Sequence, residues 1–261
     1  MYFCFIFGVQ IKLLTMRKVI ILSLGLFVLS LQSCHDDFAI ETTTGRSYEQ
    51  DAVVLNDFVD INKTTHEFFV NPNKRTTVRS YVTNSALEEM NNVTSLNREL
   101  FMESLNRVSS QAGQIVSKHG VDYVVMATNG EVYVSKVNRE SPISLNKVVL
   151  DSRNKFVTAS MNVCSDAELY NFYGNRAETV IELNPQFYSG AGWSFYVTCE
   201  IGRKEDKEIA KILFCGVGYN QNLSFTWQPN PSGGDSTDWN FIITPGGGSD
   251  IPNVGRLMFY Q

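Results

Sequence analysis

The stretch LNRELFMESLNRVSSQAGQIVSKHG, residues 96–120, decides the fold, because helical spacing ends and strand spacing begins at its last residue. Apolar residues recur in it every three or four positions, which predicts one amphipathic helix. The apolar stripe consists of Leu96, Leu100, Phe101, Leu105, Val108, Ala112, Ile115 and Val116, and we expect Asn97, Glu99, Glu103, Asn106 and Gln114 mostly on the opposite face. Lys118 and His119 fall in the last turn, where cations suit the helix dipole. Gly120 offers a left-handed cap.

Two further helical patterns precede this stretch. Apolar residues over 51–70 recur at helical spacing up to Asn71-Pro72-Asn73, which predicts a helix ending there. Ser85 with Glu88 three residues later has the form of a capping box and predicts a second helix start.

After Gly120 the apolar residues follow strand patterns. Residues 121–127 and 131–137 flank Asn129-Gly130, which predicts a hairpin. Further strands are predicted over 143–150, 156–163, 178–183, 193–201, 209–219, 223–227, 239–243 and 255–260, with a helical turn over 166–173 and a charged tip over 203–208. The fold class predicted is α+β. Helices over 51–120 would pack on an antiparallel sheet over 121–261, sandwich or barrel-like, in a single domain.

The N-terminal segment predicts where in the cell the protein is located. Arg17 and Lys18 precede an apolar run over 19–31, too short to span a bilayer with ordinary flanks. This is the layout of a secretory signal peptide. The ending Leu31-Gln32-Ser33-Cys34 resembles the lipobox of bacterial lipoproteins. The resemblance implies that residues 1–33 are removed and that Cys34 is acylated and becomes the first mature residue.

The boundaries of that segment carry two further expectations. The apolar residues 2–7 precede the charged pair instead of following it, so we expect Met16 to be the true start; an unusually long signal region is the alternative. Residues 34–50 are polar and predict a flexible lipidated tether, followed by the domain over 51–261.

Asp36 and Asp37 resemble the acidic export signal of Bacteroidota surface lipoproteins, although His35 stands directly after the cysteine and only two acids follow. The resemblance implies a lipid-anchored protein of the outer membrane, exposed at the cell surface. The periplasmic face is the alternative.

The net charge of the chain restricts the classes of partner that it can bind. The removal of residues 1–33 leaves 261 − 33 = 228 residues and takes away Lys12, Arg17 and Lys18, so the mature chain has 22 − 3 = 19 basic and 27 acidic residues, a formal charge of −8. Phosphate binding needs clustered cations, so this balance argues against nucleic acid. It also argues against electrostatic docking on anionic lipid, which leaves the lipid anchor as the membrane contact.

No catalytic constellation stands out, and we predict no catalytic residue, cofactor or metal. His66 is explained by a helix end or by a surface position, and His119 is explained by its helix end. Cys164, Cys199 and Cys215 allow at most one disulfide, and their apolar surroundings favour buried free thiols. The loop acids Asp235, Asp238 and Asp250 match no calcium-loop spacing and are interpreted as solvated.

Aromatic residues and one short motif are the remaining candidates. Trp193, Trp227 and Trp239 favour a core role, as strands prefer and bury such rings. Trp227 and Trp239 border a loop and are therefore candidates for ligand binding. Asp235-Ser236-Thr237 resembles the O-glycosylation acceptor of exported Bacteroidota proteins, which makes Ser236 a candidate modification site.

Three functions remain open, in this order. The first is a non-enzymatic binding or interaction module for a glycan, a polymer or a protein. The second is a structural or accessory subunit of an envelope assembly. The third is a cell-envelope hydrolase, which requires a pocket where two titratable side chains meet.

Overall fold

The computed structural model describes residues 45–74, 84–148, 157–162, 167–182, 192–202, 205–218, 222–229, 237–245 and 256–260. All of them belong to one compact unit, 40–261. Within these ranges the fold is mixed α+β, with mostly antiparallel sheets. Cys34, Asp36, Asp37, Cys164 and Ser236 lie outside the described residues.

The first part of the unit contains α2 (Tyr48–Asp57), the hairpin of β1 (Val59–Asn62) and β2 (Glu67–Val70), α3 (Asn84–Asn91) and α4 (Ser95–His119). Ser47 and Gln50 form a capping box at the start of α2, three residues before the predicted boundary at Asp51. Helix α4 ends as predicted: Lys118 and His119 lie in its last turn, and Gly120 adopts a left-handed conformation with φ 60° and ψ 59°.

The predicted helix over 51–70 is wrong beyond Asp57. Phe58 ends α2, and the chain turns into the β1–β2 hairpin. The Asn62 side chain accepts hydrogen bonds from the backbone N–H groups of Thr64 and Thr65, and His66 takes a positive φ of 57°. This local side-chain bonding favours a turn over a helix.

The long helix begins within one residue of the predicted start, but its first turn buries a different side chain from the one expected. Ser85 lies within α3, whereas the cap of α4 is Thr94, whose side chain accepts from the Asn97 N–H. Leu96 is 44% exposed instead of facing the core, and Asn97 is buried. The reason is that Asn97 has a buried partner on α2.

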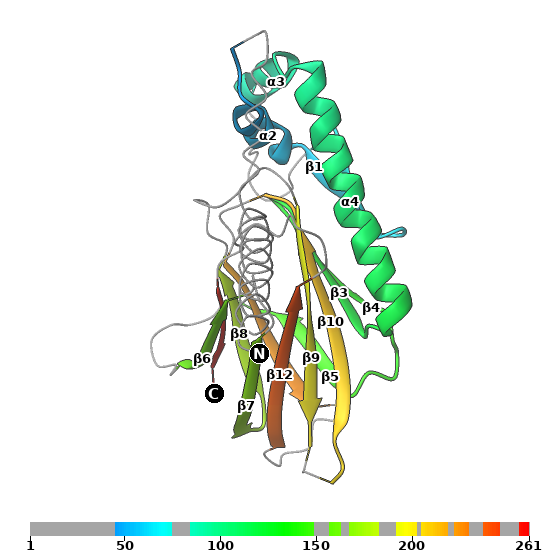
Figure 1. Cartoon of the computed structure of the whole chain (residues 1–261), viewed down its shortest axis with the longest axis vertical. Helices are drawn as coiled ribbons and strands as arrows, with labels where there is room; N and C mark the ends of the chain where they lie inside the picture. Colours follow the sequence, from blue (N-terminus) through cyan, green and yellow to red (C-terminus); the bar gives the residue numbers. More distant parts are fainter. Residues whose placement is uncertain are drawn as a thin grey trace, which may run out of the picture. The chain divides into compact units, whose positions relative to one another are not determined.

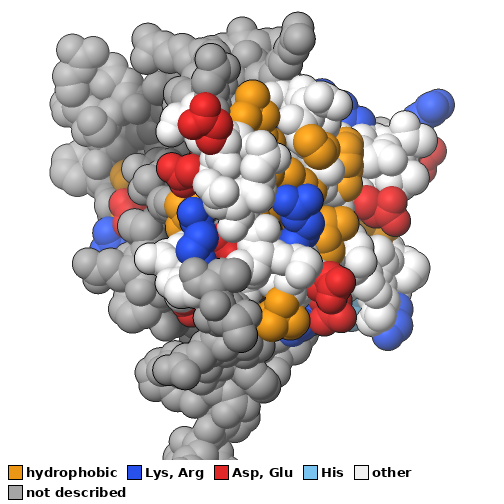
Figure 2. Space-filling view, turned by 90° about the horizontal axis from the view of Figure 1, so that it is seen from above, with side chains coloured by type: hydrophobic (Ala, Val, Ile, Leu, Met, Phe, Trp, Pro, Cys, Tyr) orange, Lys and Arg blue, Asp and Glu red, His pale blue; other side chains and the backbone are white. Residues whose placement is uncertain are grey.

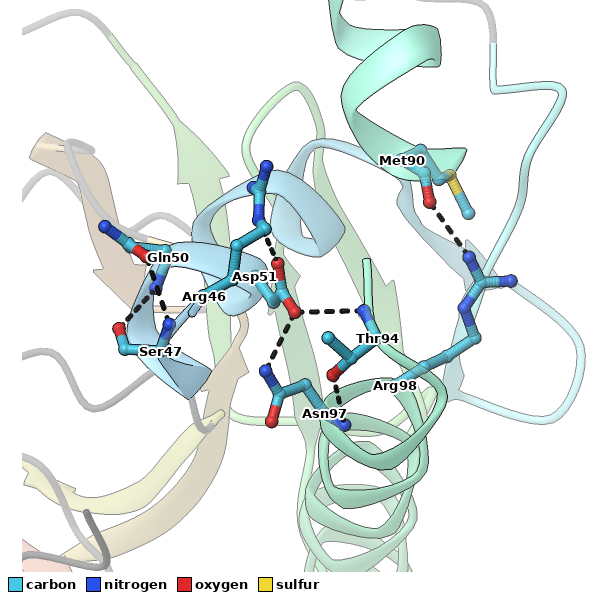
Figure 3. Close-up of polar contacts among 8 residues, drawn as sticks. All are labelled: Arg46, Ser47, Gln50, Asp51, Met90, Thr94, Asn97 and Arg98. Carbon is cyan, nitrogen blue, oxygen red and sulfur yellow. Dashed lines mark hydrogen bonds and ion pairs between the residues drawn. The ribbon is translucent and has the colours of Figure 1, made fainter. Parts of the chain in front are cut away.

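That partner is Asp51, whose buried carboxylate joins α2 to the start of α4 (Figure 3). It accepts from Arg46 Nε at 2.7 Å, from the Thr94 N–H at 3.1 Å and from Asn97 Nδ2 at 2.8 Å. Burial by itself raises the pKa of Asp51, but the three hydrogen bonds and the charge of Arg46 outweigh burial and lower it. We call these four residues the Asp51 clamp.

The remaining strands form two sheets. The strands are β3 (Tyr123–Ala127), β4 (Val132–Lys136), β5 (Ile143–Lys147), β6 (Val157–Asn162), β7 (Ala167–Gly174), β8 (Ala177–Glu182), β9 (Trp193–Ile201), β10 (Glu208–Gly216), β11 (Asn222–Pro229), β12 (Thr237–Pro245) and β13 (Arg256–Tyr260). One sheet has the order β4-β3-β10-β9-β12-β7, and the other β5-β11-β8-β13-β6.

Strand pairing confirms part of the prediction and corrects part. The hairpin around Asn129-Gly130 is present as β3–β4, and residues 193–201 form β9. The helical turn predicted over 166–173 is wrong, because Ala167–Gly174 form β7, which pairs with β12 across a bulge. The pair β3–β10 is parallel, whereas the other pairs are antiparallel.

The six-stranded sheet is covered on both faces at β3, β9 and β10. One face shares a core with the five-stranded sheet, to which Val125, Phe214 and Phe225 belong. On the other face α4 packs against β9 and β10, with Val124 and Leu213 in that second core (Figure 1). A side chain on Gly216 would run into the indole of Trp193, so glycine is required where β10 ends.

Seen from above, hydrophobic side chains form separate areas with charged side chains between them (Figure 2). The exposed large hydrophobic residues of the helices are Val53, Leu87 and Leu96. Isolated apolar residues of this kind are normal on protein surfaces.

We predict that Asp51→Ala lowers the free energy of unfolding by about 3 kcal/mol, because it leaves buried donors unpaired. The measurement is guanidinium unfolding of the purified protein. Because folding lowers the pKa of Asp51, the effect of the substitution depends on pH. The stabilising contribution of Asp51 is present above the unfolded pKa, about 3.9, and is lost as pH falls through the folded pKa. The difference in unfolding free energy between the wild type and Asp51→Ala therefore becomes smaller in acid.

Ser47→Ala is the matched control, since it removes the α2 cap and costs about 1 kcal/mol. A loss in Asp51→Ala no larger than in the control would contradict the clamp.

Candidate functional site

The two tryptophans that are candidates for ligand binding lie in the core. Trp227 and Trp239 are fully buried, and each indole N–H has a partner: Thr179 Oγ1 at 2.8 Å and the Gly174 carbonyl at 3.0 Å. Both rings therefore have the core role that the sequence favoured, and neither is exposed to a ligand. Both rings belong to the core shared by the two sheets, because their strands place them on the inner face.

The histidines and cysteines of the described residues do not form a Cys-His pair. His66 lies in the β1–β2 turn against Tyr133, and His119 ends α4 against Tyr196. Cys199 and Cys215 are free and buried, which confirms that interpretation for these two. Burial raises the pKa of Cys215 to about 12 and that of Cys199 well above its usual value. Neither thiol is therefore a thiolate near neutral pH.

Of the loop acids, Asp238 lies in β12, whereas Asp235 and Asp250 fall outside the described residues. Among the residues that the structure describes, no three histidine, cysteine or acidic side chains come together as metal ligands. No helix in the described ranges is long and apolar enough to span a membrane.

A polar group that the sequence did not indicate surrounds Lys74. It lies where the parallel strands β3 and β10 end side by side, at the carboxyl ends that often form ligand sites. The Lys74 Nζ donates to the Val59 carbonyl and, at 3.4 Å, to Thr128 Oγ1. Asp57, Asp60, Asn129 and Glu131 complete what we call the Lys74 cluster.

The acids of the cluster have partners of their own. Asp57 accepts from Asn129 Nδ2 at 3.0 Å, and Asp60 accepts from Asn71 Nδ2 at 3.0 Å. Glu131 pairs with the exposed Lys63 at 2.6 Å. The cluster thus ties the end of α2 and the β1–β2 hairpin to the turn between β3 and β4.

Lys74 has the chemistry of a general base without access to a substrate. Burial lowers its pKa, and the charges of Asp60, Asp57 and Glu131 partly oppose this shift. An amine with a lowered pKa beside a hydroxyl resembles a base and its nucleophile. Thr128, however, is fully buried, so a substrate carbonyl has no approach to it. The arrangement therefore favours a structural role.

No sequence pattern could have indicated this cluster, because its members are spread over residues 57–131 and Lys74 stands alone in an Asn-Pro-Asn-Lys turn. No family model matches the chain, and no curated protein matches it. The residues and their geometry therefore carry the functional argument.

We predict that Lys74→Met changes the pH dependence of stability. A lysine whose pKa is lowered by folding binds fewer protons in the folded state, so its stability contribution increases with pH up to the unfolded pKa, about 10.4. The free energy of unfolding of the wild type minus that of Lys74→Met should therefore rise with pH as the unfolded pKa is approached, by at most about 1.4 kcal/mol per pH unit.

Urea unfolding at several pH values measures this difference. Lys63→Met is the control, since Lys63 is exposed and its pKa is raised by Glu131. A difference that stays flat with pH for Lys74→Met would contradict the buried-amine assignment.

Proposed function

We propose that the mature chain is an outer-membrane lipoprotein, acylated at Cys34 and exposed at the cell surface, whose globular part is a non-enzymatic binding module for a glycan, a polymer or a protein. The observation that carries the proposal is the lipobox-like Leu31–Cys34 segment directly before Asp36 and Asp37. The scaffold that we propose is a sandwich, supported by the core that the two sheets share.

The start of the folded body supports a short tether. Ser47, the cap of α2, follows Cys34 by 47 − 34 = 13 residues, which span about 45 Å when fully extended. The Asp51 clamp fixes α2 to α4 immediately after this stretch. An acylated Cys34 would therefore hold the body near the membrane by its α2 end.

The burial of the Lys74 cluster favours a binding function over hydrolysis. It brings a basic group and a hydroxyl together within the described ranges, but the hydroxyl is buried and the amine also donates to the Val59 carbonyl. Such a pair stabilises the fold without offering a surface to a substrate.

Protease shaving of intact cells tests the proposed location at the cell surface. We expect digestion of the wild-type protein and protection of the Asp36→Ala/Asp37→Ala double variant, with Cys34→Ser lost from the membrane fraction. Protection of both acylated forms until the outer membrane is broken would mean that the surface assignment is wrong. Partners would then be periplasmic.

A second candidate function, an accessory subunit of an envelope assembly, is favoured by the free edge of β4. The Thr128 N–H donates to the Glu131 carbonyl, and the Val217 N–H donates to the Ala127 carbonyl. This register turns the backbone groups of Val132, Val134 and Lys136 away from β3. Among the described residues these groups have no partner, and such an edge can receive a strand from another chain.

Proline substitutions in β4 test whether this second function depends on strand addition at its edge. Val134→Pro removes an N–H that faces away from β3, so we expect a stable protein that no longer joins its assembly on native gels of detergent-solubilised membranes. Ser135→Pro is the control, because it removes an N–H directed at β3 and should destabilise the sheet itself. An assembly of unchanged size in Val134→Pro would exclude strand addition at β4.

A further inference from the structure

The outer face of the six-stranded sheet continues past the C-terminal end of α4 and carries an ordered set of side chains there. Register places Ile209 of β10 opposite Glu200 of β9, and Glu200 opposite Asn240 of β12. Two residues from Asn240 along β12, Asp238 pairs with Tyr173 of β7. We call Ile209, Glu200, Asn240, Asp238 and Tyr173 the Glu200 face.

Glu200 is held in place as an ionised acceptor. Lys207 Nζ at 2.7 Å and Asn240 Nδ2 at 3.2 Å both donate to its Oε2, while Oε1 has no partner among the described residues. The hydrogen bonds from Lys207 and Asn240 lower the pKa of Glu200, against a smaller opposing effect of burial. The side chain is 24% exposed, so a fixed carboxylate oxygen is available at the surface.

Asn240 gives a second, independent indication. It is buried, its amide donates to Glu200, and its Oδ1 has no hydrogen-bond partner among the described residues. A buried acceptor without a partner is unfavourable for folding. The amide of Asn240 therefore orients Glu200, while its Oδ1 remains a buried acceptor without a partner among the described residues.

Apolar surface flanks this polar centre on both sides. Ile209 is 55% exposed and Tyr173 is 58% exposed. They lie on β10 and β7, three strand spacings apart, which is about 14 Å. An aromatic ring and an aliphatic side chain thus border the ion pair of Glu200 and Lys207, and the acid Asp238 lies next to Tyr173.

We propose that the Glu200 face binds a neutral carbohydrate chain. The apolar groups of Tyr173 and Ile209 would contact the C–H faces of sugar rings, and Glu200 Oε1 would accept from ring hydroxyls. A preoriented acceptor lowers the ordering cost of binding. A protein partner fits less well, because the centres of protein interfaces are depleted of charged residues. This assignment rests on the proposed binding function and names its ligand class.

Affinity electrophoresis of the detergent-purified full-length protein tests the assignment, with starch, xylan, mannan or laminarin in the gel and heparin as the charged probe. We expect retardation by at least one neutral polysaccharide, and at least a tenfold weaker effect for Glu200→Gln and for Tyr173→Ala. Glu182→Gln is the matched control, as Glu182 forms a comparable exposed ion pair with Arg256 on the other sheet.

Each other outcome overturns the assignment. Retardation that Glu200→Gln and Tyr173→Ala leave unchanged places the carbohydrate site elsewhere, with the binding function intact. Retardation by heparin alone shows a charged ligand. Retardation by none of the probes rejects the carbohydrate class, whereas the surface location is decided separately by protease shaving.

Discussion

Burial of the parallel pair β3–β10 on both faces is the constraint on which the other layers depend. Every residue of β3 is buried, as is the end of β10 from Ile212 to Gly216. One face supplies the core shared with the five-stranded sheet, and the other supplies the surface against which α4 packs. Neighbouring parallel strands need a long connection, and here β4 to β9 form it. The pair therefore joins segments that are distant in sequence.

Two polar groups give this apolar arrangement its specific geometry. Hydrophobic burial is not directional, so it does not by itself fix how the helices lie on the sheet. The Asp51 clamp sets α2 against the first turn of α4, and the Lys74 cluster sets the end of α2 and the hairpin against the β3–β4 turn. Because α2 is held near both of its ends, its position is determined from two directions.

The sequence predicted features that depend on neighbouring residues and missed those that depend on distant ones. Gly120, the hairpin at Asn129-Gly130 and strand β9 follow from local periodicity and turn chemistry. The helix over 51–70 failed because short apolar runs fit both periods, and the Asn62 turn decided between them. The Lys74 cluster results from contacts between segments distant in sequence, and the Glu200 face results from strand register. A single sequence reveals neither.

Strand order also separates the two surfaces to which we assign binding. The free edge of β4 and the centre of the Glu200 face on β9 and β12 lie on opposite sides of β10, against which α4 packs. From β4 to β12 there are four strand spacings, about 19 Å. A strand added at β4 would extend the sheet away from Glu200 instead of covering it. The two functions that we propose are therefore compatible, because neither surface covers the other.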